Sequence, residues 1–403
     1  MINKDILKKT INLPPPWEVD DIIFDETEKV FIIKVIYDKD LLLEELKNKT
    51  GADISIYDHT VRRWRYLDIW EYKSYIEAKV PRIKNKESGK IEQIDVPWSD
   101  NFSRNTHFFE KVIIDALVKM SIKDVQKTYS VSWYCVETIL DKYIKKFRSE
   151  TSYKINYMGI DELSRKKGHK YFTLVYDIEK SSVVWINKDR TYESLKEFVN
   201  WYGEKKLKKV KGIAMDMWDP YIKVLKEYKI NKKIVFDKFH VTKHINEALD
   251  KIRRTESLQL YGEKIYLLKK TRYLWLSNPE NISKENDLTL KELLKYNLKT
   301  VKGYELKLLF KYFWDYKTTK HAVNFFKSWF WRATHSRLEP MIKVAHTLKK
   351  YFYGILNYVQ NNITNNLAEG INNKIRVYTK RAYGFKTEKM MMNMIYLTCG
   401  GLR

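Results

Sequence analysis

The sequence predicts a mixed α/β protein in which a large helical segment interrupts a strand-rich core. Two strand patterns each end in an acid, INYMGID at 155–161 and IAMD at 213–216, which is typical of buried strands that present a carboxylate. A third acid, Glu369, stands on a helical pattern 153 positions after Asp216. That separation is too long for a loop, so we expect a helical domain before the third acid.

The composition is that of a globular and strongly basic chain. Of the 403 residues 44% are hydrophobic, and 76 Lys and Arg against 51 Asp and Glu give a net charge of +25. Such a surface attracts polyanions, and contacts of Lys and Arg with phosphates make nucleic-acid binding sensitive to salt. The abundance of Lys, Asn, Ile and Tyr is also expected from an A/T-rich coding sequence, so charge alone leaves nucleic-acid binding open.

Membrane proteins and disulfide-stabilised proteins are not favoured. No run approaches about 18 uninterrupted apolar residues, and the first residues lack the apolar centre of a secretory signal. The two cysteines, Cys135 and Cys399, allow neither a disulfide framework nor a four-cysteine zinc site. Before residue 150 the histidines are His59 and His107, so we expect no zinc and a cytoplasmic protein.

Residues 1–100 are expected to form a small β-rich module. Alternating apolar and polar residues at 29–37 and 72–81 favour two strands. Trp64 and Trp70 fit a core better than a nucleic-acid surface, because aromatic residues at strand spacing are usually buried.

Residues 101–150 predict three helices. Phe108 and Leu117 fall on one face of the first helix, Ser121 suits the N-cap of a short second helix, and a turn leads into the third. A short helix, a turn and a longer helix are typical of a helix-turn-helix, although three-helix clusters are common in other proteins. The DNA contacts expected from the third helix are Ser132, Trp133 and Tyr134.

Residues 151–240 carry the clearest pattern, which predicts the order β-β-β-α-β-α-β. The expected strands are 155–161, 170–178, 183–186, 210–215 and 233–236, and the expected helices are 192–201 and 220–228. This order is that of the ribonuclease H fold, in which the first and fourth strands lie side by side. Their C-terminal ends would bring Asp161 and Asp216 together, although they are 55 positions apart.

The helical pattern at 365–380 divides into two faces at about 100° per residue. Its apolar face holds Leu367, Ile371, Ile375 and Tyr378, and its polar face holds Glu369, Asn372, Asn373, Arg376 and Lys380. A carboxylate among amides and cations suits a metal ion and a phosphate backbone, although a solvated face would carry similar charges. The DNA contacts expected here are Asn373, Lys374, Arg376, Lys380 and Arg381.

Four segments resemble, in the same order, bacterial insertion-sequence transposases of the DDE type, specifically the ISL-three group. They are GIDELSRKKGHKYFTLVYDIE, MDMWDPY, DKFHV, and ITNNLAEGINNKIR with its trailing KRAYGF. The resemblance implies Asp161, Asp216 and Glu369 as the catalytic, metal-binding triad, with Asp237 and His240 as a supporting pair. Members often begin with a cysteine zinc-binding module, which is absent here, so the mode of end recognition stays open.

The resemblance implies a transposase that binds the ends of an insertion sequence and catalyses metal-dependent strand cleavage and strand transfer. Two Mg²⁺ or Mn²⁺ ions would clamp the attacking and leaving oxygens. The expected partners are double-stranded DNA, at the element ends and the target, and a second copy in a homo-oligomer such as a dimer. We expect a nucleoid-associated bacterial protein.

Two alternatives remain. A domesticated, non-catalytic DNA-binding protein would be marked by a lost acid, and no acid is missing. A ribonuclease H-like nuclease without strand transfer has no need of the inserted helices. The expected domains are a β-rich module at 1–100, a helix-turn-helix at 101–150, a catalytic domain at 151–240 and 361–403, and a helical insertion at 241–360.

Overall fold

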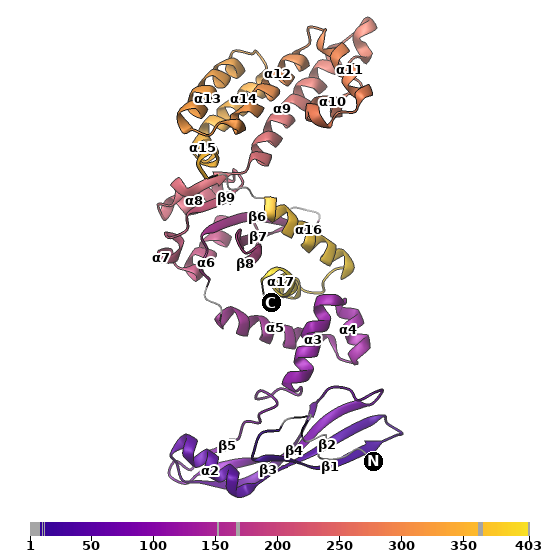
Figure 1. Ribbon diagram of the computed structural model, residues 1–403, viewed down its shortest axis with the longest axis vertical. Helices are drawn as coiled ribbons and strands as arrows, with labels where there is room; N and C mark the ends of the chain where they lie inside the picture. Colours follow the sequence, from indigo (N-terminus) through magenta and orange to yellow (C-terminus); the bar gives the residue numbers. More distant parts are fainter. Residues whose placement is uncertain are drawn as a thin grey trace. The chain divides into compact units, whose positions relative to one another are not determined.

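The structure is a computed structural model that describes residues 13–150, 153–166, 170–361 and 366–401, together with Lys9 and Ile11. The chain divides into two compact units, Met1–Tyr143 and Ile144–Arg403, and most of their elements are labelled in Figure 1. Within the described residues no helix is long and apolar enough to cross a membrane.

The first unit begins with a five-stranded sheet in the order β1-β2-β4-β3, with β5 paired to β4. Its elements are β1 (Trp17–Asp25), β2 (Val30–Tyr37), α2 (Lys39–Thr50), β3 (Ile54–Arg65), β4 (Lys73–Asn85) and β5 (Ile91–Gln93). The two predicted strands correspond to β2 and to most of β4, whereas β1, α2 and β3 were not predicted. Trp64 is buried as expected, but Trp70 is 79% exposed, so its expected place in the core is wrong.

Three helices follow, as predicted: α3 (His107–Lys119), α4 (Ile122–Tyr129) and α5 (Trp133–Glu150). The Ser121 side chain caps α4, accepting a hydrogen bond from the backbone N–H of Asp124. The buried face of α3 differs from the prediction by one residue, because Phe109 is 1% exposed and Phe108 is 51% exposed. Two adjacent phenylalanines leave the face ambiguous in the sequence, and packing selects the one in line with Ile113 and Leu117.

The second unit is built on a mixed sheet in the order β10-β9-β6-β7-β8. Its strands are β6 (Tyr157–Lys166), β7 (Lys170–Asp177), β8 (Ser182–Lys188), β9 (Gly212–Met215) and β10 (Ile234–Phe236), connected through α6 (Tyr192–Tyr202), α7 (Glu204–Leu207), α8 (Asp219–Glu227) and η1 (Asn231–Lys233). Strand β6 pairs in parallel with β9, with Ile160 opposite Met215. The expected adjacency of the first and fourth strands is therefore present.

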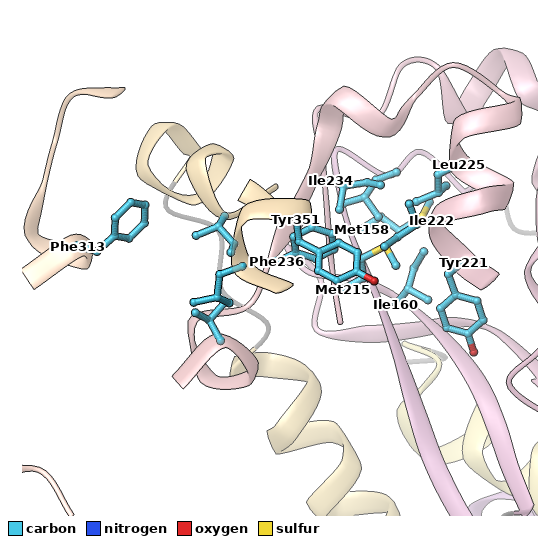
Figure 2. Close-up of a cluster of buried hydrophobic side chains, with 14 of the residues drawn as sticks. Met158, Ile160, Met215, Tyr221, Ile222, Leu225, Ile234, Phe236, Phe313 and Tyr351 are labelled. Atoms are coloured by element: carbon cyan, nitrogen blue, oxygen red, sulfur yellow. The ribbon is translucent and has the colours of Figure 1, made fainter. Parts of the chain in front are cut away.

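The core of this unit packs both faces of the parallel strands. Figure 2 shows Met158, Ile160 and Met215 among the buried side chains, with Phe236 beside Tyr351. The rings of Phe236 and Tyr351 meet edge to face at 5.5 Å. Helix α15 (Phe352–Asn361) approaches Phe236 so closely that a Cβ on Gly354 would lie 2.5 Å from the ring. The glycine is therefore required by the contact between α15 and β10.

The segment after β10 is helical, as predicted. It contains α9 (Lys238–Gln259), η2 (Gly262–Tyr266), α10 (Arg272–Leu276), η3 (Pro279–Asn281), α11 (Lys284–Leu294), α12 (Lys299–Lys311), η4 (Tyr312–Asp315), α13 (Thr319–Thr334), α14 (Glu339–Lys350) and α15. Buried Glu256 of α9 accepts hydrogen bonds from the backbone N–H groups of Lys299 (2.6 Å) and Thr300 (2.7 Å). This carboxylate provides hydrogen-bond acceptors for the free N–H groups at the start of α12 and so connects α9 to α12.

Two helices end the chain, α16 (Asn366–Arg381) and α17 (Glu388–Cys399). Ile371 and Ile375 are buried, as predicted for the apolar face of α16. The side chain of Leu367 lies outside the described part of the chain. Asn372 was expected on the polar face and is instead only 6% exposed. The cause is a pair of hydrogen bonds described below.

Candidate active site

A cavity of about 720 Å³ lies where β6 and β9 run side by side. Its lining is rich in acids and combines residues of β6, of the segment that follows β9, of α9 and of α16. The lining includes Asp161, Glu162, Arg190, Asp216, Trp218, Asp237, His240, Lys243, Glu369, Asn372 and Arg376. The three acids predicted to act together therefore share one cavity.

Asp161 lies on β6, immediately after the last residue that pairs with β9. Its Oδ1 accepts a hydrogen bond from the backbone N–H of Glu162 (2.8 Å), and its Oδ2 accepts one from Nδ2 of Asn372 (2.7 Å). Burial and the nearby charge of Asp216 raise the pKa of Asp161 to about 6, although both hydrogen bonds oppose the rise. The ionised carboxylate is therefore held in an unfavourable electrostatic environment.

Glu162 is the second acid of β6 in the cavity. Its carboxylate forms an ion pair with Arg190 at 2.7 Å. Burial raises the pKa of Glu162 to about 7 in spite of that cation. The guanidinium of Arg190 lies 3.7 Å from the centre of the Trp218 ring, and the indole N–H donates to the Arg190 carbonyl at 3.1 Å. Trp218 thus fixes the arginine that faces Glu162.

Asp216 follows β9 and meets the first turn of α9. Its Oδ1 is 2.7 Å from Nε2 of His240. Burial lowers the pKa of His240, but the contact with Asp216 and its charge outweigh burial, so the pKa is raised. Asp237 caps α9 by accepting a hydrogen bond from the N–H of Phe239 (3.0 Å). The Asp237 carboxylate therefore supports the helix turn that carries His240.

Glu369 lies on α16 and its side chain is exposed at the cavity. In the described ranges no three His, Cys, Asp or Glu side chains are grouped closely enough to hold a metal ion. The three acids therefore surround one cavity without forming a preassembled metal cage. Asn372, one turn along from Glu369, links α16 to Asp161 and so connects the helix of the third acid to the strand of the first.

The donors of this cavity fit a divalent cation. Oδ1 of Asp216 is buried. Among the described residues it forms an ion pair with His240 but accepts no hydrogen bond of good geometry. Asp161 and Glu162 are carboxylates whose ionised forms are disfavoured by burial. Oxygen donors of this kind suit Mg²⁺ or Mn²⁺, whose charge would relieve that cost.

The family model for DDE transposases of the ISL3 (ISL-three) type, described as a transposase, matches residues 158–395, a range that contains every acid of this cavity. The chain belongs to this family of transposases. The transposase for insertion sequence element IS1001 of Bordetella parapertussis is 28% identical over 338 residues, 83% of each chain. The transposase for IS1557 of Mycobacterium tuberculosis is 24% identical over an aligned length of 440 residues, which covers 100% of this chain and 97% of the relative.

The residues of α16 that were expected to contact DNA do not all lie at the acidic cavity of the transposase. Arg376 lines the acidic cavity, whereas Asn373, Lys380 and Arg381 are exposed along the helix. The ammonium of Lys374 donates to the Thr398 carbonyl at 2.7 Å and so ties α16 to α17. Of these residues, Arg376 is the one that the structure brings to the acids.

The three residues expected to contact DNA from α5 lie at its start. The Ser132 hydroxyl accepts a hydrogen bond from the N–H of Cys135 (3.1 Å) and thus begins the helix. Tyr134 is 73% exposed, and Trp133 is half-buried. The side chain of this segment most available to a partner is therefore Tyr134.

Sequence reasoning did not select several residues of the transposase cavity. Glu162 adjoins Asp161 in the sequence, but strand alternation argues for opposite faces. Asn372 was placed on the polar face of α16 without a role of its own, whereas its Oδ1 accepts a hydrogen bond from the Tyr176 hydroxyl at 2.9 Å. Trp218 belongs to the MDMWDPY segment, but no role was assigned to it there. Arg190 stands in a loop outside the four segments, so no local signal pointed to it.

Proposed function

We propose that this transposase is a DDE enzyme that binds the ends of an insertion sequence and catalyses metal-dependent DNA strand cleavage and strand transfer. The observation that carries the proposal is the convergence of Asp161, Asp216 and Glu369 on one cavity from three separate elements. The strand order with β6 beside β9 supports a ribonuclease H-like catalytic core, interrupted by the helices α9 to α15.

In this proposal Asp161, Asp216 and Glu369 supply oxygen ligands for two Mg²⁺ or Mn²⁺ ions. When bound, such ions neutralise the charge that develops on the attacking and leaving oxygens at phosphorus. Asn372 holds the Asp161 carboxylate by its hydrogen bond, and His240 holds that of Asp216. These two neighbours fix the acids in place before DNA arrives, which lowers the cost of ordering them.

The nucleophiles are expected to be water in the cleavage step and the freed 3′-hydroxyl of the DNA in the transfer step. Arg376 is positioned to contact a phosphate at the cavity, with Lys380 and Arg381 further along α16. Such contacts hold the DNA in register without reading its sequence.

Recognition of the element ends is assigned to the helix-turn-helix of α3, α4 and α5, with Tyr134 at the DNA. The β-rich module before it would assist without zinc. A homo-oligomer, such as a dimer, would hold two ends of double-stranded DNA at once. The organisation proposed is the one expected from the sequence, with the catalytic domain at 151–240 and 361–403 and the helical insertion at 241–360.

The test uses the purified protein and a DNA fragment that carries the reading frame with both of its flanks. In Mg²⁺ or Mn²⁺ we expect nicks at discrete positions on either side of the frame and joining of the new 3′ ends to a target plasmid. Ca²⁺ or excess EDTA should leave the fragment intact. Binding of the flanks without cleavage in Mg²⁺ or Mn²⁺, or full activity in EDTA, would overturn the proposal.

A further inference from the structure

A second cavity, of about 780 Å³, follows helix α9 away from the acidic cavity. Phe239, Lys243 and Glu247 line both cavities. The second cavity, here called the α9 groove, is therefore continuous with the first at the start of the helix. A chain molecule whose reactive part lies between the acids would extend into this groove.

The α9 groove is one stripe of a long amphipathic helix. Its α9 residues recur every three or four positions, from Phe239 through Lys243, Glu247, Lys251 and Arg254 to Leu258. A stripe of this length extends about 30 Å along a helix. The opposite face, which includes Val241, Ile245 and Leu249, is buried in the core. The fold therefore uses one face of α9 for packing and leaves the other open along five turns.

The charges of the groove suit a polyanion. Arg272 joins the three cations of the stripe, Lys243, Lys251 and Arg254, against the carboxylates of Glu247 and Asp250. The Asp250 carboxylate forms ion pairs with Arg253 at 2.8 Å and with Arg272 at 3.5 Å. The exposed ammonium and guanidinium groups of Lys251 and Arg254 would thus meet phosphates beyond the acidic cavity.

The apolar residues of the groove suit an unpaired base better than a protein partner. Phe239 is 62% exposed at the junction of the two cavities, and its ring lies edge to face with His240 at 5.4 Å. Its backbone is fixed by the cap at Asp237. Large apolar side chains are three of the twelve lining residues, Phe239, Leu258 and Leu276, too few for an apolar interface. An exposed ring beside spaced cations is typical of single-strand binding.

We propose that the α9 groove binds a short single-stranded segment of DNA next to the reactive phosphate, with a base stacked on Phe239 and phosphates at Lys251 and Arg254. The inference rests on the proposed function, because the acidic cavity defines which phosphate reacts. A double helix does not offer the face of a base to a side chain, so the segment must be unpaired where it meets Phe239. The groove would then hold a segment of one strand that is unpaired from its complement next to the bond that is cleaved.

The test measures binding of a fluorescent oligothymidine of twenty nucleotides by anisotropy, with the full chain in EDTA. Phe239→Leu removes the aromatic face but keeps an apolar side chain, and the Lys251→Ala, Arg254→Ala double variant removes two cations. Each is expected to weaken single-strand binding about tenfold, while a duplex of unrelated sequence binds within about twofold of wild type. Phe239→Trp should bind as tightly as wild type.

Matched controls are Trp331→Leu, at a 61% exposed aromatic residue of α13, and Lys320→Ala, Lys327→Ala, two exposed cations of the same helix. They should bind the oligonucleotide as wild type does. Equal losses in the groove and control variants, or none in the groove variants, would overturn the assignment. So would groove variants that change the sedimentation of the protein but not its DNA affinity, because the groove would then be an interface between protein copies. Failure of cleavage with intact groove binding would contradict the proposed function alone.

Discussion

Among the residues of the cavity, Asn372 joins α16 to β6 and β7 through both ends of its side-chain amide. Helical periodicity placed it on the polar face of α16, away from Ile371 and Ile375, and that face was expected to meet a metal ion and a phosphate backbone, with a solvated face as the alternative. The fold instead buries the amide against β6 and β7, where Tyr176 donates to it and Asp161 accepts from it. A buried amide is tolerated when both of its ends are hydrogen-bonded, and those partners lie about 200 positions away in the chain. No local pattern carries that information.

Replacing Asn372 by alanine is expected to impair catalysis through the position of Asp161. The variant loses the hydrogen bond to Oδ2, so cleavage should fall about tenfold, and the Mg²⁺ concentration for half-maximal cleavage should rise. Asn324→Ala is the matched control, because Asn324 is an exposed asparagine of α13 with no place in the cavity. A loss of activity without any change in Mg²⁺ dependence would assign Asn372 a structural role only.

The raised pKa of Asp161 predicts how pH changes the stability of the metal-free protein. The folded chain keeps this proton up to about pH 6, whereas the unfolded chain loses it near pH 4. The folded state therefore binds more protons between these values, and raising the pH through this window lowers the free energy of unfolding by about 2 kcal/mol.

The pH effect of Asp161 is measured as a difference from Asp161→Asn, which does not titrate there. Urea titrations in EDTA should show the variant gaining on wild type by about 2 kcal/mol between pH 4 and pH 7. Added Mg²⁺ should then stabilise wild type more than the variant at pH 7. A difference that stays constant with pH would contradict the electrostatic environment described for Asp161.

At the scale of elements, the sequence predicted most strands and helices of 155–236 closely, because buried strands, turns and amphipathic helices alternate there with clear periods. The first strand was expected to end at Asp161, whereas β6 continues to Lys166, so Asp161 lies within the strand. The observed β7, β8, α6, α8 and β10 each match a predicted element to within two residues at either end. The N-terminal sheet was recovered only in part. Strand β1 contains acidic residues and half-buried residues that do not alternate strictly. It is recognised as a strand by its pairing with β2, which its own sequence does not reveal.

Gly354→Ala tests the close approach of α15 to β10. A methyl group there would lie 2.5 Å from the buried Phe236 ring, so we expect a loss of about 1–3 kcal/mol in the free energy of unfolding. Gly370→Ala is the matched control, because nothing lies within 4 Å of its added methyl. Alanine in that helix should stabilise by about 0.5–1 kcal/mol. Thermal unfolding that shows both variants unchanged or both destabilised would contradict the packing described.

At the scale of the whole molecule, the sequence predicted which distant acids would share a site. Four segments in the family's order implied the three acids. Parallel pairing of β6 and β9 accounts for two of them, because it places Asp161 and Asp216 at one edge of the sheet. The companions of those acids, Arg190, Trp218 and Asn372, could not be predicted. Their positions depend on how loops and α16 pack, and packing is a property of the assembled unit.

If α3 to α5 recognise the DNA ends and the acidic cavity cleaves them, a substitution in α5 should weaken specific binding without changing non-specific binding. Tyr134→Ala in the full-length protein is expected to weaken binding of the DNA flanks of its reading frame about tenfold, with no loss for a duplex of unrelated sequence. Tyr312→Ala, at a 60% exposed tyrosine of the second unit, is the control. Equal binding of the flanks by wild type and Tyr134→Ala would remove the start of α5 from end recognition.

The joint role of the three acids is tested by cleavage of that flanking DNA in Mg²⁺ by Asp161→Ala, Asp216→Ala and Glu369→Ala, each checked for folding and for DNA binding. We expect each variant to bind DNA nearly as wild type does and to lose about 100-fold or more of its cleavage rate. Glu339→Ala, at an exposed acid of α14, should cleave normally. Normal cleavage by any one of the three variants would contradict the claim that these acids act together in one active site.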